Sequence, residues 1–135
     1  MVNILVIDDD ALVRETIRTM LQLEGHEVAL APHGEDGLRR FRQQAFDVVI
    51  CDIFMPRKGG METVAEIRRI SPDVPIIAMT GGAGDVPDTG TPDYAHYLHL
   101  TRLAGATTTI AKPFRPRDLF ALIGKSLGDG KPSTP

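Results

Sequence analysis

Acidic side chains stand at the ends of two apolar runs, and they are the residues in this sequence best suited to chemistry. The run 48–51 ends on Asp52, and the run 2–7 is followed by Asp8, Asp9 and Asp10. Both runs are continuous rather than alternating, which is typical of strands buried on both faces. A charge at such a strand end costs free energy unless a partner compensates it. We therefore take Asp52 as a candidate nucleophile that the rest of the fold serves.

A hydroxyl and a lysine stand at the ends of two further segments that we predict to be strands. Thr80 ends the run 74–79, and Lys112 follows the run 107–111. In an open parallel sheet, ligands bind outside the carboxyl ends of the strands, so these side chains would join the aspartates. A carboxylate nucleophile, a hydroxyl, a lysine and a metal ion together make a phosphoryl-transfer site, in which the cations neutralise the phosphoryl oxygens.

We expect Asp8, Asp9 and Asp52 to lie close together, which places three negative charges near one another. Either one carboxyl stays protonated or a cation neutralises the cluster. Oxygen ligands suit a hard cation, so we expect Mg²⁺. Simpler interpretations of single residues stay open, with Asp10 as a helix cap, Thr80 as an ordinary strand-end residue and Lys112 as a solvated lysine. They leave unexplained why all these positions share one edge of the sheet.

The apolar runs alternate with amphipathic segments along the whole chain. We expect strands at 2–7, 27–31, 47–51, 74–79 and 107–111, and helices at 12–23, 34–44, 61–70, 93–104 and 115–127. This alternation predicts an α/β domain with helices on both faces of a parallel sheet. We expect the flavodoxin-like, doubly wound, five-stranded sheet with strand order 2-1-3-4-5 and five helices, which places the first and third strands side by side.

Composition bounds the classes of function. The chain has 135 residues, a net charge of −3 and one cysteine, so we expect one domain at 1–127 and a flexible tail or linker at 128–135. The charge argues against direct nucleic-acid binding, and no apolar run is long enough for a membrane span. No basic segment precedes an apolar one after Met1, so no signal peptide is expected. One cysteine favours a reducing compartment, and we expect a cytoplasmic location.

Four motifs together resemble the receiver domain of two-component response regulators. They begin at Ile4, Asp47, Pro75 and Ala111, and they read ILVIDDD, DVVICDIFMP, PIIAMT and AKPF. The resemblance extends from about Asn3 to Leu127. Each motif alone is weakly specific, but their presence in this order is highly specific.

The resemblance implies a role for each acidic residue. Asp52 would accept a phosphoryl group from a sensor histidine kinase or a phosphotransfer protein. Asp9 and Asp52 would coordinate Mg²⁺ directly, Asp8 would bind it largely through water, and the backbone carbonyl of Phe54 would complete the metal site. The domain would then be a signalling module rather than an enzyme that turns over an external substrate, with a downstream partner and a phosphorylation-dependent homodimer as further expectations.

The same resemblance assigns Thr80 a hydrogen bond to the phosphoryl group and Lys112 an ion pair with it, and it implies a cis bond between Lys112 and Pro113. Three features depart from the family, and one of them is Gly81 directly after Thr80, where another small residue, often Ala, is common. The position three residues before the lysine, where receivers usually carry Tyr or Phe, is Thr109. The segment Gly81–Pro92 is longer than expected and rich in glycine, and we interpret it as a mobile loop.

Two other functions remain as alternatives. A pseudo-receiver would bind partners independently of phosphorylation, which the departure at Thr109 favours and the complete acidic set opposes. A phosphatase that forms an aspartyl-phosphate would need a second aspartate two residues after the nucleophile, and Phe54 occupies that position.

Overall fold

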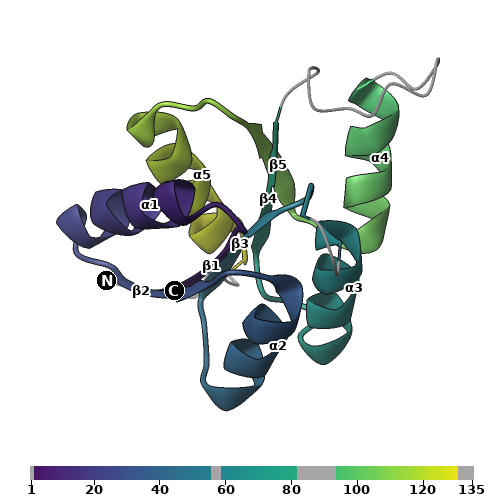
Figure 1. The fold of residues 1–135 in the computed structure, drawn as a ribbon, viewed down its shortest axis with the longest axis horizontal. Helices are drawn as coiled ribbons and strands as arrows, with labels where there is room; N and C mark the ends of the chain where they lie inside the picture. The colour runs from purple at the N-terminus through teal and green to yellow at the C-terminus, as the bar shows by residue number, and fades with distance from the viewer. Residues whose placement is uncertain (1, 56–58, 82–93, 131–135) are drawn as a thin grey trace.

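Five parallel strands form one twisted sheet. The computed structural model describes residues 2–55, 59–81 and 94–130. The strands pair in the order β2-β1-β3-β4-β5 (Figure 1), with bounds β1 (Asn3–Ile7), β2 (Glu27–Ala31), β3 (Val48–Asp52), β4 (Ile76–Thr80) and β5 (Thr108–Ala111). The predicted fold class and strand order are confirmed.

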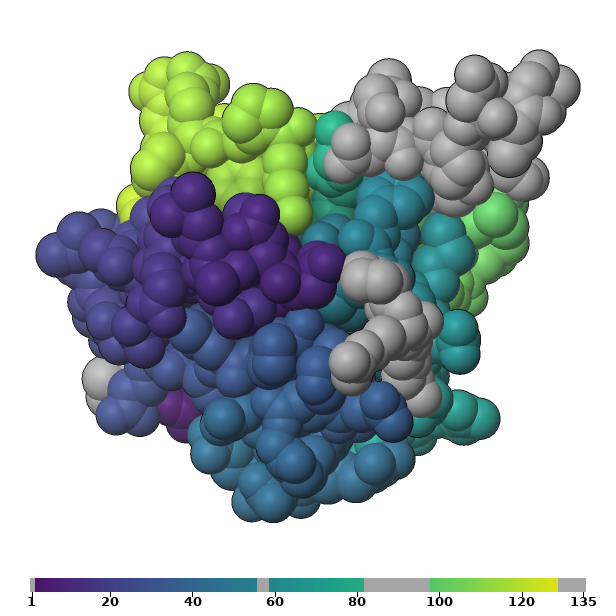
Figure 2. Space-filling view, in the orientation of Figure 1, coloured from purple at the N-terminus to yellow at the C-terminus, as the bar shows by residue number. Residues whose placement is uncertain are grey.

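Helices cover both faces of this sheet. Their bounds are α1 (Ala11–Leu23), α2 (Gly34–Gln43), α3 (Gly60–Ile70), α4 (Tyr94–Ala104) and α5 (Pro116–Gly130). Helices α1 and α5 lie side by side over one face, as the purple and yellow-green surfaces in Figure 2 show. Helices α2 and α3 cover the other face, and α4 packs beside α3 (Figure 1). No described helix is both long and apolar enough to cross a bilayer.

Continuous apolar strands are what a sheet covered on both faces requires. Every residue of β3 and β4 is buried. Alternate side chains enter different cores, since Val49 and Cys51 pack toward α2 and α3 whereas Val48 and Ile50 pack toward α1 and α5. Strand side chains alternate between the two faces of a sheet, so the parity of a residue within its strand decides which core it joins.

The strand register brings the carboxyl ends level. Ile7 pairs with Cys51, so Asp8 and Asp52, which follow them, lie opposite each other. Asp52 pairs with Met79 across β3 and β4. Thr80 pairs with Ala111, the residue before the lysine. Residues far apart in the chain therefore meet at one edge of the sheet.

The helix ends follow local sequence signals. The side chain of Asp10 accepts hydrogen bonds from the backbone N–H groups of Leu12, at 2.8 Å, and Val13, at 3.3 Å, so it caps α1 as predicted. Gly25 follows the last turn of α1 with φ of +88°, a left-handed conformation that glycine adopts readily. Predicted and observed bounds of the elements differ by at most three residues.

Helix α5 is the main difference in extent. It continues to Gly130, beyond the expected end at Leu127. The sequence places no proline until Pro132, and a glycine within a helix costs only about 1 kcal/mol, so nothing stops the helix at Gly128. The segment 131–135 and the expected loop Gly81–Pro92, apart from Gly81 itself, lie outside the described residues.

Helix α3 begins unusually close to the end of β3. The backbone N–H of Gly60 donates to the carbonyl oxygen of Ile53 at 3.2 Å. A β-carbon added at Gly60 would collide with the carbonyl oxygen of Asp52 and with the backbone of Ile53. Only glycine lets the helix approach this strand end, which carries the candidate nucleophile.

We predict that Gly60→Ala destabilises the protein because it pushes α3 away from the end of β3. Overpacking of this kind costs about 1–3 kcal/mol, which urea denaturation would measure. Gly124→Ala is the matched control, because a β-carbon at Gly124 in α5 meets nothing within 4 Å and alanine in an open helix position adds up to about 1 kcal/mol of stability. A neutral effect of Gly60→Ala would contradict the close approach.

Candidate functional site

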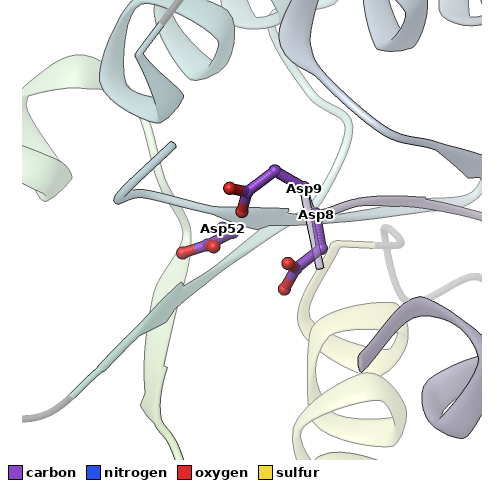
Figure 3. Close-up of side chains that lie close together, drawn as sticks. All are labelled: Asp8, Asp9 and Asp52. Atoms are coloured by element: carbon purple, nitrogen blue, oxygen red, sulfur yellow. The ribbon is translucent and has the colours of Figure 1, made fainter. Parts of the chain in front are cut away.

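Three aspartates converge where β1 and β3 end (Figure 3). Asp8, Asp9 and Asp52 each offer one carboxylate oxygen, and these oxygens all lie within 4.8 Å of one another. Asp52 is the last residue of β3, and Asp8 and Asp9 follow β1 directly. The structure therefore brings together the aspartates that the sequence places at two separate strand ends.

The three carboxylates differ in their burial. Asp8 is 0% exposed and Asp52 is 5% exposed, whereas Asp9 is exposed to solvent. Side chains two residues apart along a strand lie on the same face of the sheet. Asp8 is two residues after Val6, and Asp52 is two residues after Ile50. Val6 and Ile50 pack toward α1 and α5, so the two aspartates are buried on that side. Asp9 lies beyond the strand and is free of this constraint.

Lys112 is the cation that faces this cluster. Its Nζ lies 2.8 Å from Asp8 Oδ2 and 3.4 Å from Asp52 Oδ2. The lysine follows Ile110 by two residues, so it projects to the same face of the sheet as the two buried aspartates. One lysine against three carboxylates leaves the cluster with excess negative charge when all of them are ionised.

Backbone N–H groups hold two of the carboxylates in place. The N–H of Asp10 donates to Asp8 Oδ1 at 2.9 Å, and the N–H of Phe54 donates to Asp52 Oδ1 at 3.1 Å. Arg14 Nη1 donates to the backbone carbonyl of Asp8 at 2.8 Å and so ties α1 to the loop after β1. Sequence reasoning missed Arg14, because its place in the first turn of α1 does not reveal which carbonyl it reaches.

Burial and charge shift the pKa values at this site. Burial raises the pKa of Asp52 from its ordinary 3.8 to about 6, and the charge of Asp8 adds to the rise, although Lys112 and the N–H of Phe54 oppose it. Burial lowers the pKa of Lys112, but its hydrogen bond to Asp8 and the charge of Asp52 outweigh burial and raise that pKa overall. The carboxyl of Asp52 is thus costly to ionise, and Lys112 stays charged.

Thr80 and Thr109 occupy neighbouring strands. Thr80 is buried at the end of β4, 1% exposed, and its carbonyl accepts the backbone N–H of Lys112 at 2.6 Å. Its side chain has the parity of Ala78, which packs toward α2 and α3. Thr109 pairs with Ala78 in the sheet and is partly buried. The proposed hydroxyl thus belongs to the face opposite that of Asp52.

Two further observations concern residues beside the site. The peptide bond between Lys112 and Pro113 is cis, as the resemblance implied. Cys51 is fully buried, and burial together with the charges of Asp52 and Asp8 raises the pKa of its thiol. The thiol therefore stays protonated.

The aspartate cluster suits a hard divalent cation. Its ligand atoms are all carboxylate oxygens, which Mg²⁺ and Ca²⁺ prefer. Mg²⁺ typically binds through one or two carboxylates and keeps several waters, which fits a cluster with one solvent-exposed member, Asp9. Burial is the main cause of the raised pKa of Asp52, so a bound cation would favour the ionised carboxylate. The three aspartates therefore provide the kind of ligands that Mg²⁺ requires.

Comparison with known proteins identifies the family. Residues 4–124 match the response regulator receiver domain. A probable transcriptional regulator, ycf27, from Guillardia theta is 42% identical over 122 residues, which cover 90% of this chain and 43% of that protein. A homolog of the transcriptional regulatory protein CpxR from Haemophilus influenzae is 34% identical over 123 residues, or 91% of this chain and 49% of that protein.

Solved structures agree with the sequence comparisons. A response regulator receiver domain protein from Clostridium thermocellum superposes with a TM-score of 0.83 at 30% identity, and the match covers 96% of both chains. The chain belongs to the receiver domain family of two-component response regulators. It spans less than half the length of the two curated relatives. Receiver domains generally bind Mg²⁺ at an acidic pocket, and this chain has a cluster of three aspartates that could hold a metal ion.

We predict that Asp52→Asn stabilises the metal-free protein at pH 8. The folded pKa of about 6 exceeds the ordinary 3.8, so the folded state binds more protons between these values and stability falls as pH rises through that window. A neutral amide avoids this cost, which is about 1–3 kcal/mol for a shift of this size. Urea denaturation in EDTA would measure the gain, which should shrink as the pH falls toward 4.

Addition of Mg²⁺ provides the control for this prediction. A ligand that binds only the folded state stabilises it in proportion to its occupancy. The unmodified protein should therefore gain more stability from Mg²⁺ than Asp52→Asn, which lacks one carboxylate ligand. Equal gains in the two proteins would show that Asp52 does not contact the cation.

Proposed function

We propose that this domain receives a phosphoryl group on Asp52 from a sensor histidine kinase or a phosphotransfer protein, with Mg²⁺ as cofactor. One observation carries the proposal: Asp52, a buried carboxylate, lies in a three-aspartate cluster with Lys112 Nζ at 3.4 Å. Nucleophile, metal ligands and a cation for the phosphoryl oxygens are the parts that phosphoryl transfer needs. Membership in the receiver family supports the assignment.

The residues divide the chemistry among themselves. A carboxylate oxygen of Asp52 attacks phosphorus, the P–O bond forms as the P–N bond of the donor phosphohistidine breaks, and the product is an acyl phosphate. Lys112 stabilises negative charge on the phosphoryl oxygens. The N–H of Phe54 orients the nucleophile through Asp52 Oδ1. Asp9, Asp52 and the backbone carbonyl of Phe54 would hold Mg²⁺, and Asp8 would bind it largely through water. The cation would supply positive charge that stabilises the negative charge of the phosphoryl group.

The alternatives receive less support. A pseudo-receiver has no need for the pairing of Lys112 with two buried aspartates, which the structure retains. A phosphatase would need a general acid at the position of Phe54, which is a phenylalanine. We therefore propose a switch without turnover of an external substrate.

The output of the switch is also a proposal. The two curated relatives are named as transcriptional regulators, so the phosphorylated domain would control an output of that kind or bind a downstream partner, with a homodimer as one form of the active state. We propose that Thr80 hydrogen-bonds the phosphoryl group and that Thr109 takes the place of the usual aromatic residue. A cytoplasmic location is consistent with the free, buried thiol of Cys51.

Acetyl phosphate provides the direct test. We expect intact-mass spectrometry to show one added phosphoryl group when acetyl phosphate and Mg²⁺ are present, and none when EDTA replaces Mg²⁺. Asp52→Asn should abolish the adduct. Asp47→Asn is the matched control, because Asp47 precedes the same strand at its opposite end and accepts the N–H of Asn3 at 2.8 Å, an interaction an asparagine oxygen can keep. Labelling that persists in Asp52→Asn would disprove the assignment.

Lys112→Gln should change two measurements in opposite directions. Without the ammonium group, Mg²⁺ meets less repulsion and binds about tenfold more tightly by isothermal titration calorimetry. Phosphorylation by acetyl phosphate should slow about a hundredfold, because the phosphoryl oxygens lose a positive donor. Arg117→Gln, which removes one positive charge from an exposed position on α5, should leave both unchanged. Weaker Mg²⁺ binding by Lys112→Gln would mean that the lysine does not compete with the cation.

A further inference from the structure

A second polar pocket lies at the opposite end of the sheet from Asp52. Its volume is about 270 Å³, and it opens beside the edge strand β5, which α4 and α5 flank (Figure 1). Thr108 begins β5 and Lys112 follows its end, so about 13 Å of strand separates the pocket from the aspartate cluster. The lining residues are Arg102, Thr107, Thr108, Leu122, Lys125 and Ser126.

Two cations from different helices line this pocket without a carboxylate partner. Arg102 comes from the last turn of α4, and Lys125 comes from α5. Within the described part of the chain, neither side chain makes a hydrogen bond or an ion pair. The nearby Arg68 is different, because it donates to the carbonyls of Gly105, Ser71 and Pro72. The pocket thus holds two positive charges that no protein group uses.

The hydroxyl groups of the pocket can also donate hydrogen bonds. Thr107 Oγ1 accepts the N–H of Ile76 at 3.0 Å and Arg68 Nη2 at 3.3 Å. Both of its lone pairs are occupied, so its own hydrogen is left to donate. Ser126 is only 5% exposed, and its hydroxyl makes no hydrogen bond to another described residue. No buried side-chain nitrogen or oxygen of the described residues lacks a hydrogen-bond partner, so the Ser126 hydroxyl keeps access to solvent and its hydrogen is available to a ligand in the pocket.

We propose that this pocket binds a small phosphate-bearing molecule. Its donors come from α4, from the residue before β5 and from α5. The three terminal oxygens of a phosphate monoester can accept hydrogen bonds from several directions at once, whereas a planar carboxylate offers two oxygens. Leu122 supplies an apolar wall for the rest of the molecule. Ser126 also borders a neighbouring pocket that contains Asp47 and Asp73, so the phosphate lies on the side of Arg102 and Lys125.

This site is independent of phosphorylation at Asp52. A bound phosphate would join the carboxyl-terminal part of α4 to α5, two helices that otherwise lie on different sides of β5. The ligand therefore acts as a bridge across the edge of the sheet. Binding is expected in the absence of Mg²⁺ and in a protein that cannot be phosphorylated.

Titration with inorganic phosphate, followed by two-dimensional ¹⁵N NMR, tests the proposal. The protein carries Asp52→Asn and the buffer contains EDTA, so the aspartate cluster cannot respond. We expect saturable amide shifts at Thr107, Thr108 and Ser126. Arg102→Gln and Lys125→Gln should each weaken phosphate binding about tenfold, as expected for the loss of one charge-assisted hydrogen bond.

The controls separate a specific site from a general charge effect. Arg117→Gln, a change of an exposed arginine on α5 outside the pocket, should leave binding unchanged, and sodium chloride at matched ionic strength should not reproduce the shifts. Acetate should bind more weakly than phosphate. Ser126→Ala, which removes no charge, should also weaken binding and covers the case in which a charge variant misfolds. Shifts that chloride reproduces, or that survive Arg102→Gln and Lys125→Gln, would overturn the proposal, as would equal affinity for acetate.

Discussion

Repulsion among three carboxylates is the constraint on which this structure depends. The fold holds Asp8, Asp9 and Asp52 within 4.8 Å and offers Lys112 as the facing cation. Such a cluster does not persist by chance at a buried strand end, because ionised carboxylates without compensation destabilise the folded state. The surrounding sheet has to supply enough stability to hold the cluster in readiness for a cation and an anionic group.

The two faces of the sheet divide the work of the site. Asp8, Asp52 and Lys112 share the parity of residues that pack toward α1 and α5. Thr80 shares the parity of Ala78, which packs toward α2 and α3. The two faces of the sheet therefore contribute different parts of the site, with the carboxylates and the lysine on one face and the threonine on the other.

Much of the fold could be predicted because buried parallel strands leave a plain signal. The runs before Asp8, Asp52 and Thr80 are mostly apolar, and the alternation of such runs with amphipathic segments indicates the class of sheet. The details of the site could not be predicted in the same way. Only the register shows that Asp8 lies level with Asp52, and only the packed structure shows that Lys112 sits closer to Asp8 than to Asp52.

Contacts that depend on backbone approach were invisible for a physical reason. Gly60 reads in the sequence as part of a turn, yet its lack of a side chain is what lets α3 begin against the carbonyl of Asp52. Arg14 reads as a solvated helix residue, yet it fixes the loop that carries Asp8 and Asp9. Gly60 acts on the backbone of Asp52, and Arg14 acts on the backbone of Asp8. The periodicity of a sequence indicates which face a side chain occupies, but not how closely two backbone segments approach. The positions of the acidic side chains therefore depend on residues that take no part in the chemistry and that the sequence pattern does not reveal.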